Sequence, residues 1–583
     1  MILRRPSRLV ASLVVAAAVL AAGCRPPART APQPIDDPPA LGPGWFDDVT
    51  DRVGLDFVHD PGPLDGSYFM PQSIGSGAAL FDFDGDGRLD IYLLQNGGPK
   101  SSSTNRLYKQ MPDGKFKDVS KGSGLDIGGY SMGVAIGDVN NDGKPDVLVT
   151  QYGGLKLFLN NGDGTFTDVT EESGLKDPLW GVSASFFDCD RDGMLDLVVV
   201  NYVDNDPAWV CKSQSDQGRD YCSPNVFPGT VVKLFHNVTK PGGKPRFEDV
   251  TEASGLAKIP GPGLGVVCAD FNGDGWPDIF IANDLQPNRL WINQRDGTFK
   301  EEAVKRGVGY DGMGKAQSGM GVAVGDVNGD GLDDIFVTHL GAETNTLWMQ
   351  EPRGLFKDRT AASGLAAPKW HGTGWGTVLA DFDLDGVLDL ALVNGRVSRG
   401  EALPGSAALG KYWSLYAERN QLFAGDGKGR FRDLSPDQPE LCGVPNEARG
   451  LAVGDVNNDG APDLLVTTIG GKARLLINRA PKRGHWLTVR AVDPALKRDA
   501  IGAQVVVTAG GRDWMRRIDP GGSYLCSGDM RALFGLGKAN AVDGIVVKWP
   551  DGSREQFAGG PADRAIELHK GEGRPAAEEK QDR

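Results

Sequence analysis

The residues best suited to chemistry are aspartates arranged in a fixed nine-residue pattern. The stretch DFDGDGRLD, which begins at Asp82, carries aspartate at its first, third, fifth and ninth positions. Side-chain oxygens at alternate positions of a short loop can converge on one point, and glycine at the sixth position permits the turn that follows. Oxygen ligands that are mostly carboxylates favour Ca²⁺ over a transition metal. The stretch therefore predicts a calcium site.

The pattern, D-x-[DN]-x-D-G-x-x-D, occurs seven times, at intervals of roughly 50 to 80 residues. The predicted metal ligands, loop by loop, are Asp82, Asp84, Asp86 and Asp90; Asp138, Asn140, Asp142 and Asp146; Asp188, Asp190, Asp192 and Asp196; Asp270, Asn272, Asp274 and Asp278; Asp326, Asn328, Asp330 and Asp334; Asp381, Asp383, Asp385 and Asp389; and Asp455, Asn457, Asp459 and Asp463. Up to seven Ca²⁺ ions are expected. Loops with asparagine at the third position have one carboxylate fewer and should bind less tightly.

A simpler interpretation is that these residues only cap turns, as aspartate and asparagine often do. Turn capping does not require an acid at the first, fifth and ninth positions of all seven copies. The repeated acids therefore favour metal binding.

Each repeat contains four short segments that read as β-strands. In the second repeat, GVAIGD leads into the loop, DVLVTQY leads out of it, and LKLFLNN and GTFTDVT follow. These segments are rich in β-branched and aromatic residues and are bounded by Gly, Asn or Asp. Four antiparallel strands in each of seven repeats predict an all-β fold, a seven-bladed β-propeller with metal loops between the first and second strands.

The two ends of the repeat region are expected to meet in one blade. The fourth-strand segment WFDDVT, near Trp45, precedes the first metal loop, and no such segment follows RLLIN at Arg474. The N-terminal strand should therefore complete the last blade, which leaves no open sheet edge. The predicted propeller spans residues 45–480.

The loop pattern and its flanking strands resemble the FG-GAP/VCBS repeat family, which includes the integrin α-chain propellers. The resemblance implies that the loops bind Ca²⁺. Residues 481–570 contain KRDAIGAQVVV, GGSYLCSGD, FGLG and VKWPDG, which resemble the ASPIC/UnbV domain of the cartilage acidic protein family. Alternating apolar residues in this segment predict a small β-sandwich-like domain. The tail, 571–583, is charged and expected to be disordered.

The N-terminus has the features of a secretory signal. Arg4, Arg5 and Arg8 precede an apolar run over residues 9–22, which is shorter than the about 20 residues that span a bilayer. The sequence LAAGC at Cys24 resembles a bacterial lipobox, which implies lipidation of Cys24 after removal of residues 1–23; an ordinary cleaved signal is the alternative. Residues 24–44 are Pro-rich and suit a tether. The predicted location is the cell envelope, at the outer membrane or cell surface, with membrane contact only through the lipid.

Charge and cysteine content limit the possible functions. The formal charge of −15 loses three arginines with the signal, and a chain near −18 is poorly suited to nucleic acid. Export to an oxidising compartment favours disulfides. Cys211 and Cys222 lie close together in a polar insertion and are predicted to pair. The other cysteines after Cys24 are expected to be small buried residues, and no zinc-binding spacing occurs.

Long insertions are predicted on the face opposite the metal loops. Residues 56–73 precede the first strand of their blade, whereas 204–230 and 396–419 fall between second and third strands. Binding residues are often carried by such loops. The residues that could line a ligand funnel there are His59, Tyr152, Trp180, Tyr202, Asp284, His339, Trp370, His371 and Arg396. These residues could instead end strands or pack in the core.

Two functions follow from this organisation. The favoured one is a non-catalytic, calcium-stabilised propeller that binds a protein or glycan partner, as an adhesion or scaffold protein, through its metal-free face. The alternative is an enzyme, biosynthetic or metal-dependent, that uses a funnel on that face. The sequence holds no G-x-S-x-G, H-E-x-x-H or phosphate-loop motif, and no catalytic residue is assigned.

Overall fold

The computed structural model describes residues 44–213, 217–481 and 484–576 of the 583-residue chain. The predicted signal sequence, Cys24, most of the Pro-rich segment and residues 577–583 lie outside the described residues. Strands dominate the described part, where no helix is longer than five residues. None of these helices is long and apolar enough to cross a membrane. The fold is all-β, as predicted.

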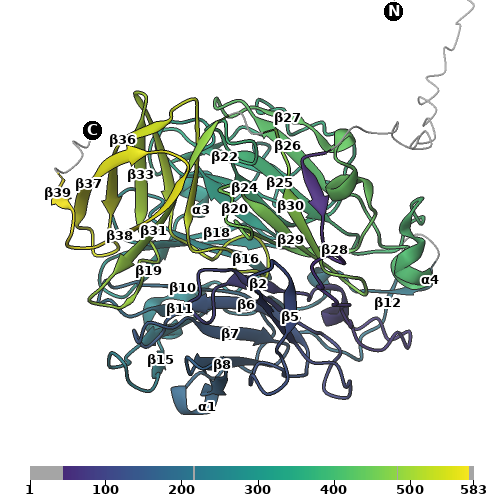
Figure 1. Cartoon of the computed structure of the whole chain (residues 1–583). Helices are drawn as coiled ribbons and strands as arrows, with labels where there is room; N and C mark the ends of the chain where they lie inside the picture. Colours follow the sequence, from purple (N-terminus) through teal and green to yellow (C-terminus); the bar gives the residue numbers. More distant parts are fainter. Residues whose placement is uncertain (1–43, 214–216, 482–483, 577–583) are drawn as a thin grey trace, which may run out of the picture. The chain divides into compact units, whose positions relative to one another are not determined.

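Seven four-stranded sheets succeed one another along the described chain (Figure 1). The first three sheets comprise β2 (Ala78–Phe81), β3 (Asp90–Leu93), β4 (Arg106–Gln110) and β5 (Phe116–Asp118); β6 (Ser131–Gly137), β7 (Asp146–Gln151), β8 (Gly154–Asn160) and β9 (Phe166–Asp168); and β10 (Gly181–Phe187), β11 (Asp196–Asn201), β14 (Lys233–Asn237) and β15 (Phe247–Asp249). The next three comprise β16 (Gly263–Ala269), β17 (Asp278–Asn283), β18 (Arg289–Asn293) and β19 (Phe299–Glu301); β20 (Val322–Gly325), β21 (Asp334–Val337), β22 (Thr346–Gln350) and β23 (Phe356–Asp358); and β24 (Gly374–Ala380), β25 (Asp389–Asn394), β26 (Gln421–Gly425) and β27 (Phe431–Asp433). The seventh contains β28 (Ala448–Gly454), β29 (Asp463–Thr468), β30 (Arg474–Asn478) and β1 (Phe46–Asp48).

Short elements occupy the connections between these strands. They are η1 (Met70–Ser73), α1 (Thr170–Ser173), β12 (Cys211–Lys212), β13 (Arg219–Asp220), η2 (Pro224–Val226), α2 (Thr251–Ser254), η3 (Leu256–Lys258), α3 (Ala303–Arg306), η4 (Ser406–Leu409), α4 (Gly410–Trp413), η5 (Ser435–Asp437) and η6 (Pro439–Gly443). Because neighbouring strands are antiparallel, the connections between second and third strands, and those between sheets, lie at the end of the sheets opposite the D-x-[DN]-x-D-G-x-x-D loops.

The N-terminal strand completes the seventh sheet, as predicted. β1 pairs antiparallel with β30, with Phe46 opposite Asn478 and Asp48 opposite Leu476. The first strands of consecutive sheets also contact one another in a closed cycle: β2, β6, β10, β16, β20, β24, β28 and again β2. The arrangement is propeller-like, because every first strand contacts the first strands of the two neighbouring sheets.

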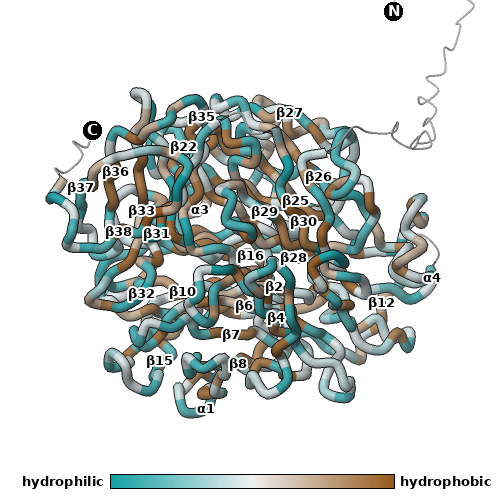
Figure 2. Tube along the Cα trace, viewed as in Figure 1, coloured by the Kyte–Doolittle hydropathy of each residue, from teal (hydrophilic) through white to brown (hydrophobic). Residues whose placement is uncertain are grey.

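Glycines allow the first strands to approach one another closely. A Cβ atom on Gly321 would lie 2.0 Å from the Trp375 carbonyl oxygen, and one on Gly265 would lie 2.2 Å from that of Met320. Hydrophobic side chains then pack neighbouring sheets together; Phe336, Leu390 and Phe423, for example, share a core between the fifth and sixth sheets. Figure 2 shows hydrophobic residues along strands such as β30 and β33.

The C-terminal region forms two sheets with a shared core. One contains β31 (His485–Asp493), β32 (Arg498–Asp499), β35 (Ala532–Gly537) and β38 (Arg564–His569). The other contains β33 (Gln504–Ala509), β34 (Arg512–Arg517), β36 (Ala541–Lys548), β37 (Arg554–Pro561) and β39 (Arg574–Pro575). Val489 from the first sheet and Val507 and Val547 from the second are fully buried in that core.

One loop of the C-terminal domain enters the cycle of first strands. Residues 518–531, which we call the channel loop, join β34 to β35. The Ser527 carbonyl accepts a hydrogen bond from the Leu80 N–H (3.0 Å) of the first sheet, and the Ser523 carbonyl accepts one from Val322 (3.0 Å) of the fifth. Tyr524 is fully buried, with its ring 5.0 Å from that of Trp375. The two predicted domains are therefore interlocked.

Candidate functional site

Each ninth-position aspartate begins the second strand of its sheet and ties the loop to the third strand. Asp146 accepts hydrogen bonds from the backbone N–H groups of Val139 (3.0 Å) and Asn160 (2.9 Å). Equivalent pairs of backbone donors are Phe83 and Gln110 at Asp90, Cys189 and Asn237 at Asp196, Phe271 and Asn293 at Asp278, Val327 and Gln350 at Asp334, Phe382 and Gly425 at Asp389, and Val456 and Asn478 at Asp463. All seven repeats share this geometry.

The first-position aspartates organise the loops themselves. Asp138 accepts hydrogen bonds from the N–H groups of Asp142 (3.1 Å) and Gly143 (2.8 Å), the fifth and sixth positions. The same two bonds form at Asp82, Asp270, Asp326, Asp381 and Asp455. In the third loop Asp188 accepts from Gly193 (3.1 Å), while its Oδ1 is buried without a hydrogen-bond partner.

Burial makes the charged form of these carboxylates costly. It raises the pKa of Asp90 to about 7 and that of Asp334 to about 8. Among the first-position residues, burial raises the pKa of Asp188 and of Asp381 to about 7. A cation beside these oxygens would offset the cost and favour the ionised form.

Three loops bring carboxylates close enough to share an ion. The groups are Asp82, Asp84 and Asp86; Asp188, Asp190 and Asp192; and Asp381, Asp383 and Asp385, whose ligand atoms lie within 4.8 Å of one another in each group. These are the three loops with aspartate at the third position. In the fourth loop the third-position Asn272 instead donates a hydrogen bond to the neighbouring carboxylate of Asp274 (3.1 Å).

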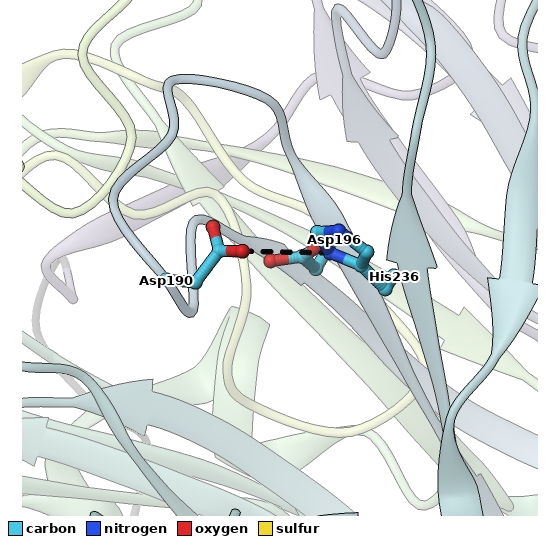
Figure 3. A group of neighbouring side chains, drawn as sticks. All are labelled: Asp190, Asp196 and His236. Atoms are coloured by element: carbon cyan, nitrogen blue, oxygen red, sulfur yellow. Dashed lines mark hydrogen bonds and ion pairs between the residues drawn. The ribbon is translucent and has the colours of Figure 1, made fainter. Parts of the chain in front are cut away.

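The third loop is faced by an additional side chain with metal-binding chemistry, which the sequence pattern did not predict. His236 in β14 places its Nδ1 atom 2.9 Å from Asp196 Oδ1 and 3.7 Å from Asp190 Oδ2 (Figure 3). The hydrogen bond with Asp196 raises the pKa of His236 to about 9. The group combines two carboxylates and one imidazole.

The C-terminal domain packs against the side of the sheets that carries the D-x-[DN]-x-D-G-x-x-D loops. Arg498 Nε donates to Asn141 Oδ1 (2.9 Å) in the second loop, and Lys548 Nζ lies 3.0 Å from Asp270 Oδ2 in the fourth. Further contacts join Trp514 to the Gly386 carbonyl and Arg531 to the Asp455 carbonyl. A cavity of about 370 Å³ lies between this domain and the first two loops. The loop side is therefore partly covered, whereas the insertions lie at the other end of the sheets.

The three insertions contact one another and form one surface. We call residues 56–73, 204–213, 217–230 and 396–419 the insertion surface. Cys211 and Cys222 form a disulfide, with Cα atoms 5.2 Å apart. The ring of Tyr221 lies 5.4 Å from Tyr68 and 5.7 Å from Tyr416, which brings all three insertions together.

A buried carboxylate fixes the centre of this surface. Asp220 accepts a hydrogen bond from Tyr416 Oη (2.7 Å) and another from the Arg399 backbone N–H (3.0 Å). Tyr412 Oη lies 3.1 Å from Tyr221 Oη. The insertions are thus joined by polar contacts as well as by aromatic packing.

The predicted ligand funnel is filled with side chains. Tyr152, Trp180 and Tyr202 do lie together, with ring centroids 5.4 and 5.2 Å apart, and Tyr202 donates to Asp284 (2.6 Å). Trp180 and Tyr202 are only 2% and 1% exposed, because η1 and the channel loop occupy the space between the sheets. Tyr524 of the channel loop donates a hydrogen bond to the Ile74 carbonyl (3.2 Å), which connects the channel loop to the residue that follows η1. The described residues therefore leave no open funnel at this position.

The three predicted histidines are not assembled into a site. His59 and His339 are buried, and burial lowers their pKa values to about 3 and about 4, so both are neutral at physiological pH. His371 is exposed. These residues form no metal-ligand group within the described chain.

The remaining two candidates are held by local contacts. Trp370 donates to the Arg419 carbonyl (3.2 Å). Arg396 donates to the Glu401 carbonyl (2.8 Å) and pairs with Glu418 (3.4 Å). Neither is directed into a common cavity by these contacts.

Comparison with known families agrees with the repeat geometry. A model described as FG-GAP-like repeat matches residues 82–149, 138–199, 270–337, 326–392 and 412–466, and a model described as ASPIC and UnbV matches residues 493–575. The chain belongs to the FG-GAP-like repeat family. It also carries a C-terminal ASPIC and UnbV domain, as predicted.

The similar curated proteins include cartilage acidic protein 1 from two vertebrates. The Xenopus tropicalis protein is 29% identical over 357 residues, which cover 59% of this chain and 51% of that protein. The Homo sapiens protein is 29% identical over 378 residues, which cover 62% of this chain and 53% of that protein. The chain spans about half the length of these relatives.

Solved structures with a similar course of the chain are more distant. An Agrocybe aegerita lectin that recognises non-reducing terminal N-acetylglucosamine matches with a TM-score of 0.35 and 16% identity, over 63% of this chain and 84% of that one. A Bacillus licheniformis rhamnogalacturonan lyase matches with a TM-score of 0.37 and 14% identity, over 75% of this chain and 76% of that one.

Two sets of residues in this FG-GAP repeat protein were missed by sequence reasoning. His236 stands where the other repeats have Lys109, Leu159, Ile292, Met349, Ala424 and Ile477, and alignment of the third strands would have shown it as the only imidazole. The aromatic cluster uses Tyr68, Tyr221, Tyr412, Trp413 and Tyr416. The concentration of tyrosines in insertions predicted for one face was the available signal.

Proposed function

We propose that this chain is a calcium-stabilised, seven-bladed β-propeller that binds a partner protein, without catalysis, through its insertion surface. The observation that carries the proposal is the contrast between seven loops with one repeated geometry and three unrelated insertions that assemble at the other end of the sheets. Repetition suits a structural role, and an irregular surface on a rigid scaffold suits recognition.

Calcium fits the residues of the loops. Every loop offers oxygen atoms only from its patterned positions, which is the donor set that Ca²⁺ prefers. The ninth-position carboxylates accept two backbone hydrogen bonds each, but an ionised carboxylate has about four acceptor sites. Oxygen lone pairs therefore remain available. Bound Ca²⁺ would supply the positive charge that buried, neighbouring carboxylates need, so that metal affinity contributes to folding.

The exposed apolar residues support a protein partner. The described chain exposes twelve large hydrophobic side chains, and all except Leu355 lie in connections at the end of the sheets away from the metal loops: Val58, Leu64, Trp209, Val210, Val226, Ile259, Leu285, Val304, Tyr310, Met313 and Val444. Most are aliphatic, which suits contact with another protein more than stacking on a sugar ring.

The partner surface can be tested with charged substitutions. Full-length protein would capture a partner from envelope extracts, and affinity for that purified partner would then be measured by biolayer interferometry. We expect Trp209→Asp and Val226→Asp to weaken binding by about tenfold or more, because each places a charge in an apolar contact. Leu355→Asp, at the other end of the sheets, is the matched control. Equal affinities for all four proteins would contradict the proposed surface.

We also propose that the chain is a lipoprotein of the cell envelope. The disulfide between Cys211 and Cys222 supports an oxidising compartment. Mass spectrometry of the mature N-terminus should find a diacylglycerol-modified Cys24, and Cys24→Ser should move the protein from the membrane fraction to the soluble fraction. An unmodified N-terminus elsewhere in the chain would overturn the anchor and leave the surface proposal intact.

A further inference from the structure

The third metal loop differs from the other six in the residue that faces it from the third strand. His236 in β14 corresponds to Lys109 in β4 and to apolar residues in the remaining sheets. Lys109 pairs with Asp84 and Asp86 through its ammonium group, which has no lone pair for a metal. An imidazole nitrogen, by contrast, can either donate a proton or bind a metal.

The distances around His236 suit a shared metal ion. Nδ1 lies 2.9 Å from Asp196 Oδ1 and 3.7 Å from Asp190 Oδ2 (Figure 3). Two ligands that each bind one ion at about 2.1 Å are separated by about 3.0 Å at a right angle and about 3.4 Å at the tetrahedral angle. The observed separations bracket these values. Small rotations of the three side chains would suffice to place all three atoms on one ion.

A buried oxygen in the same loop has no partner. Asp188 Oδ1 makes no hydrogen bond, although the Asp188 side chain is only 7% exposed. Its carboxylate lies within 4.8 Å of a ligand oxygen of Asp190, which also faces His236. An unsatisfied buried oxygen is costly, so an ion bound beside Asp190 would give Asp188 Oδ1 the partner that the hydrogen bonds of the loop do not supply.

The basic residues nearest to Asp188 direct their hydrogen bonds elsewhere. Arg498 donates to Asn141, to the Gly193 carbonyl and to the Asp499 carbonyl. Arg191 donates to the Gly275 carbonyl. Both guanidinium groups contribute positive charge to the region, but neither gives Asp188 Oδ1 a hydrogen bond.

We propose that the third loop is a transition-metal site, in which His236 Nδ1 and carboxylates of Asp188, Asp190 and Asp196 hold a divalent first-row ion such as Zn²⁺ or Mn²⁺. Imidazole is a good ligand for these ions and a poor one for Ca²⁺. The site would therefore differ in metal from the other six loops. The proposal does not depend on calcium in those loops, since it rests on residues that only the third repeat contains.

The experiment uses Co²⁺ as a spectroscopic probe of the full-length protein. Protein stripped of metal is titrated with Co²⁺ in the presence of millimolar Ca²⁺, and the visible d–d absorption and the stoichiometry are recorded. We expect about one equivalent of Co²⁺ to give a visible band that Zn²⁺, but not Ca²⁺, displaces. His236→Ile, which installs the residue of the fourth and seventh repeats, should remove the band and weaken Zn²⁺ binding by about tenfold or more.

A matched control is available in the C-terminal domain. His485 also has its Nδ1 beside one carboxylate, that of Asp563 (2.6 Å), but it is half-buried and lies outside every loop. His485→Asn should leave the Co²⁺ spectrum and the Zn²⁺ affinity unchanged. If His236→Ile fails to fold, His236→Gln keeps a polar side chain of similar length and provides the same comparison.

Two results would overturn the proposal. One is an unchanged Co²⁺ affinity and spectrum in the His236 variant. The other is ¹⁵N NMR of the wild-type protein with excess Zn²⁺ in which His236 carries protons on both ring nitrogens, because an imidazolium would then serve as a fixed counter-charge to Asp190 and Asp196. Either result can occur while the melting temperature still depends on Ca²⁺, so failure here is distinguishable from failure of the calcium proposal.

Discussion

The two ends of the propeller sheets are built on different principles. At one end, seven loops repeat the same hydrogen bonds from their first-position and ninth-position aspartates, with small departures only in the third loop. At the other end, the insertions share no pattern and are joined by an aromatic cluster and one buried aspartate, Asp220, while a disulfide closes one of them. The patterned aspartates, which are the strongest candidates for chemistry in the sequence, therefore belong to the regular end.

This difference supports the proposed division between a structural end and a recognition end. Backbone geometry that recurs in every repeat has to satisfy the same local requirement each time, which is to hold a turn of like charges together. The C-terminal domain also packs on that end, through contacts such as that between Lys548 and Asp270. The insertion end keeps its apolar side chains exposed, including Trp209 at 54%. Perturbations at the two ends should consequently have different readouts.

Removal of calcium should produce the largest loss of stability. Unfolding should then begin at the loop end of the sheets. One site saturated at 1,000 times its Kd contributes about 4 kcal/mol of stability, and several sites act together here. We expect EGTA to lower the melting temperature by more than about 10 °C, with recovery on adding Ca²⁺ and little recovery with Mg²⁺.

Hydrogen exchange would show where that loss begins. Amides in the seven loops should exchange faster after EGTA treatment, whereas those next to the disulfide at Cys211 and Cys222 should change less. An unchanged melting temperature would contradict calcium stabilisation. Equal acceleration at both ends would contradict the division of roles.

Removal of one ninth-position aspartate should have the next largest effect. Asp278 is fully buried and accepts hydrogen bonds from Phe271 and Asn293. Asp278→Ala therefore removes the acceptor of the Asn293 N–H and leaves the Phe271 N–H with the Ala269 carbonyl alone. We expect a loss of about 2 to 5 kcal/mol in the free energy of unfolding, measured with urea at saturating Ca²⁺. Asp296→Ala, at an exposed turn of the same sheet, is the control and should shift the midpoint far less. Similar shifts for the two variants would show that the hydrogen bonds of the ninth-position aspartate contribute little to stability.

Much of the regular end was predictable from sequence because its determinants are local. A loop pattern of nine residues and strands of three to seven residues fix which backbone groups meet within one repeat. The pairing of β1 with β30 also followed, since counting third-strand and fourth-strand segments left one of each without a neighbour. The same reasoning placed all three insertions at one end, because an antiparallel sheet allows no other choice.

The channel loop was not predictable in this way. GGSYLCSGD was assigned to the C-terminal domain, but its backbone pairs with strands more than 100 residues away, as between Ser523 and Val322. No local periodicity encodes a partner at that distance. The predicted funnel was wrong for this reason. Trp180 and Tyr202 were placed on the correct sheets, yet they face side chains rather than solvent. His236 was missed because a single departure is hidden inside a repeated strand pattern.

The buried histidines predict an acid sensitivity that belongs to neither metal nor partner. Burial lowers the pKa of His59 to about 3 and that of His339 to about 4, below the unfolded value of about 6.5. The unfolded chain therefore binds more protons between these values, and stability present above pH 6.5 is lost as the pH falls toward 4. Each histidine should account for about 1.5 kcal/mol between pH 6.5 and pH 5.

This sensitivity can be measured by urea denaturation across that pH range, with saturating Ca²⁺ to keep the loop carboxylates ionised. His339→Leu should flatten the pH dependence, and His371→Gln, at an exposed position, should not. If His339→Leu retains the full slope, other groups control the acid response.

The smallest expected effect concerns the insertion end and gives the sharpest test of its independence. Tyr416 donates to the buried carboxylate of Asp220 (2.7 Å), so Tyr416→Phe removes one hydrogen bond while keeping the ring in the aromatic cluster. We expect a cost of about 1 kcal/mol, the usual net contribution of one hydrogen bond. The hydrogen bonds of Asp220 all come from residues of the insertions. The variant should therefore bind Ca²⁺ with wild-type stoichiometry and should lose affinity for the partner instead. A variant that lost calcium and kept its partner would show that the two ends are coupled through the sheets, and the division between a structural end and a recognition end would have to be abandoned.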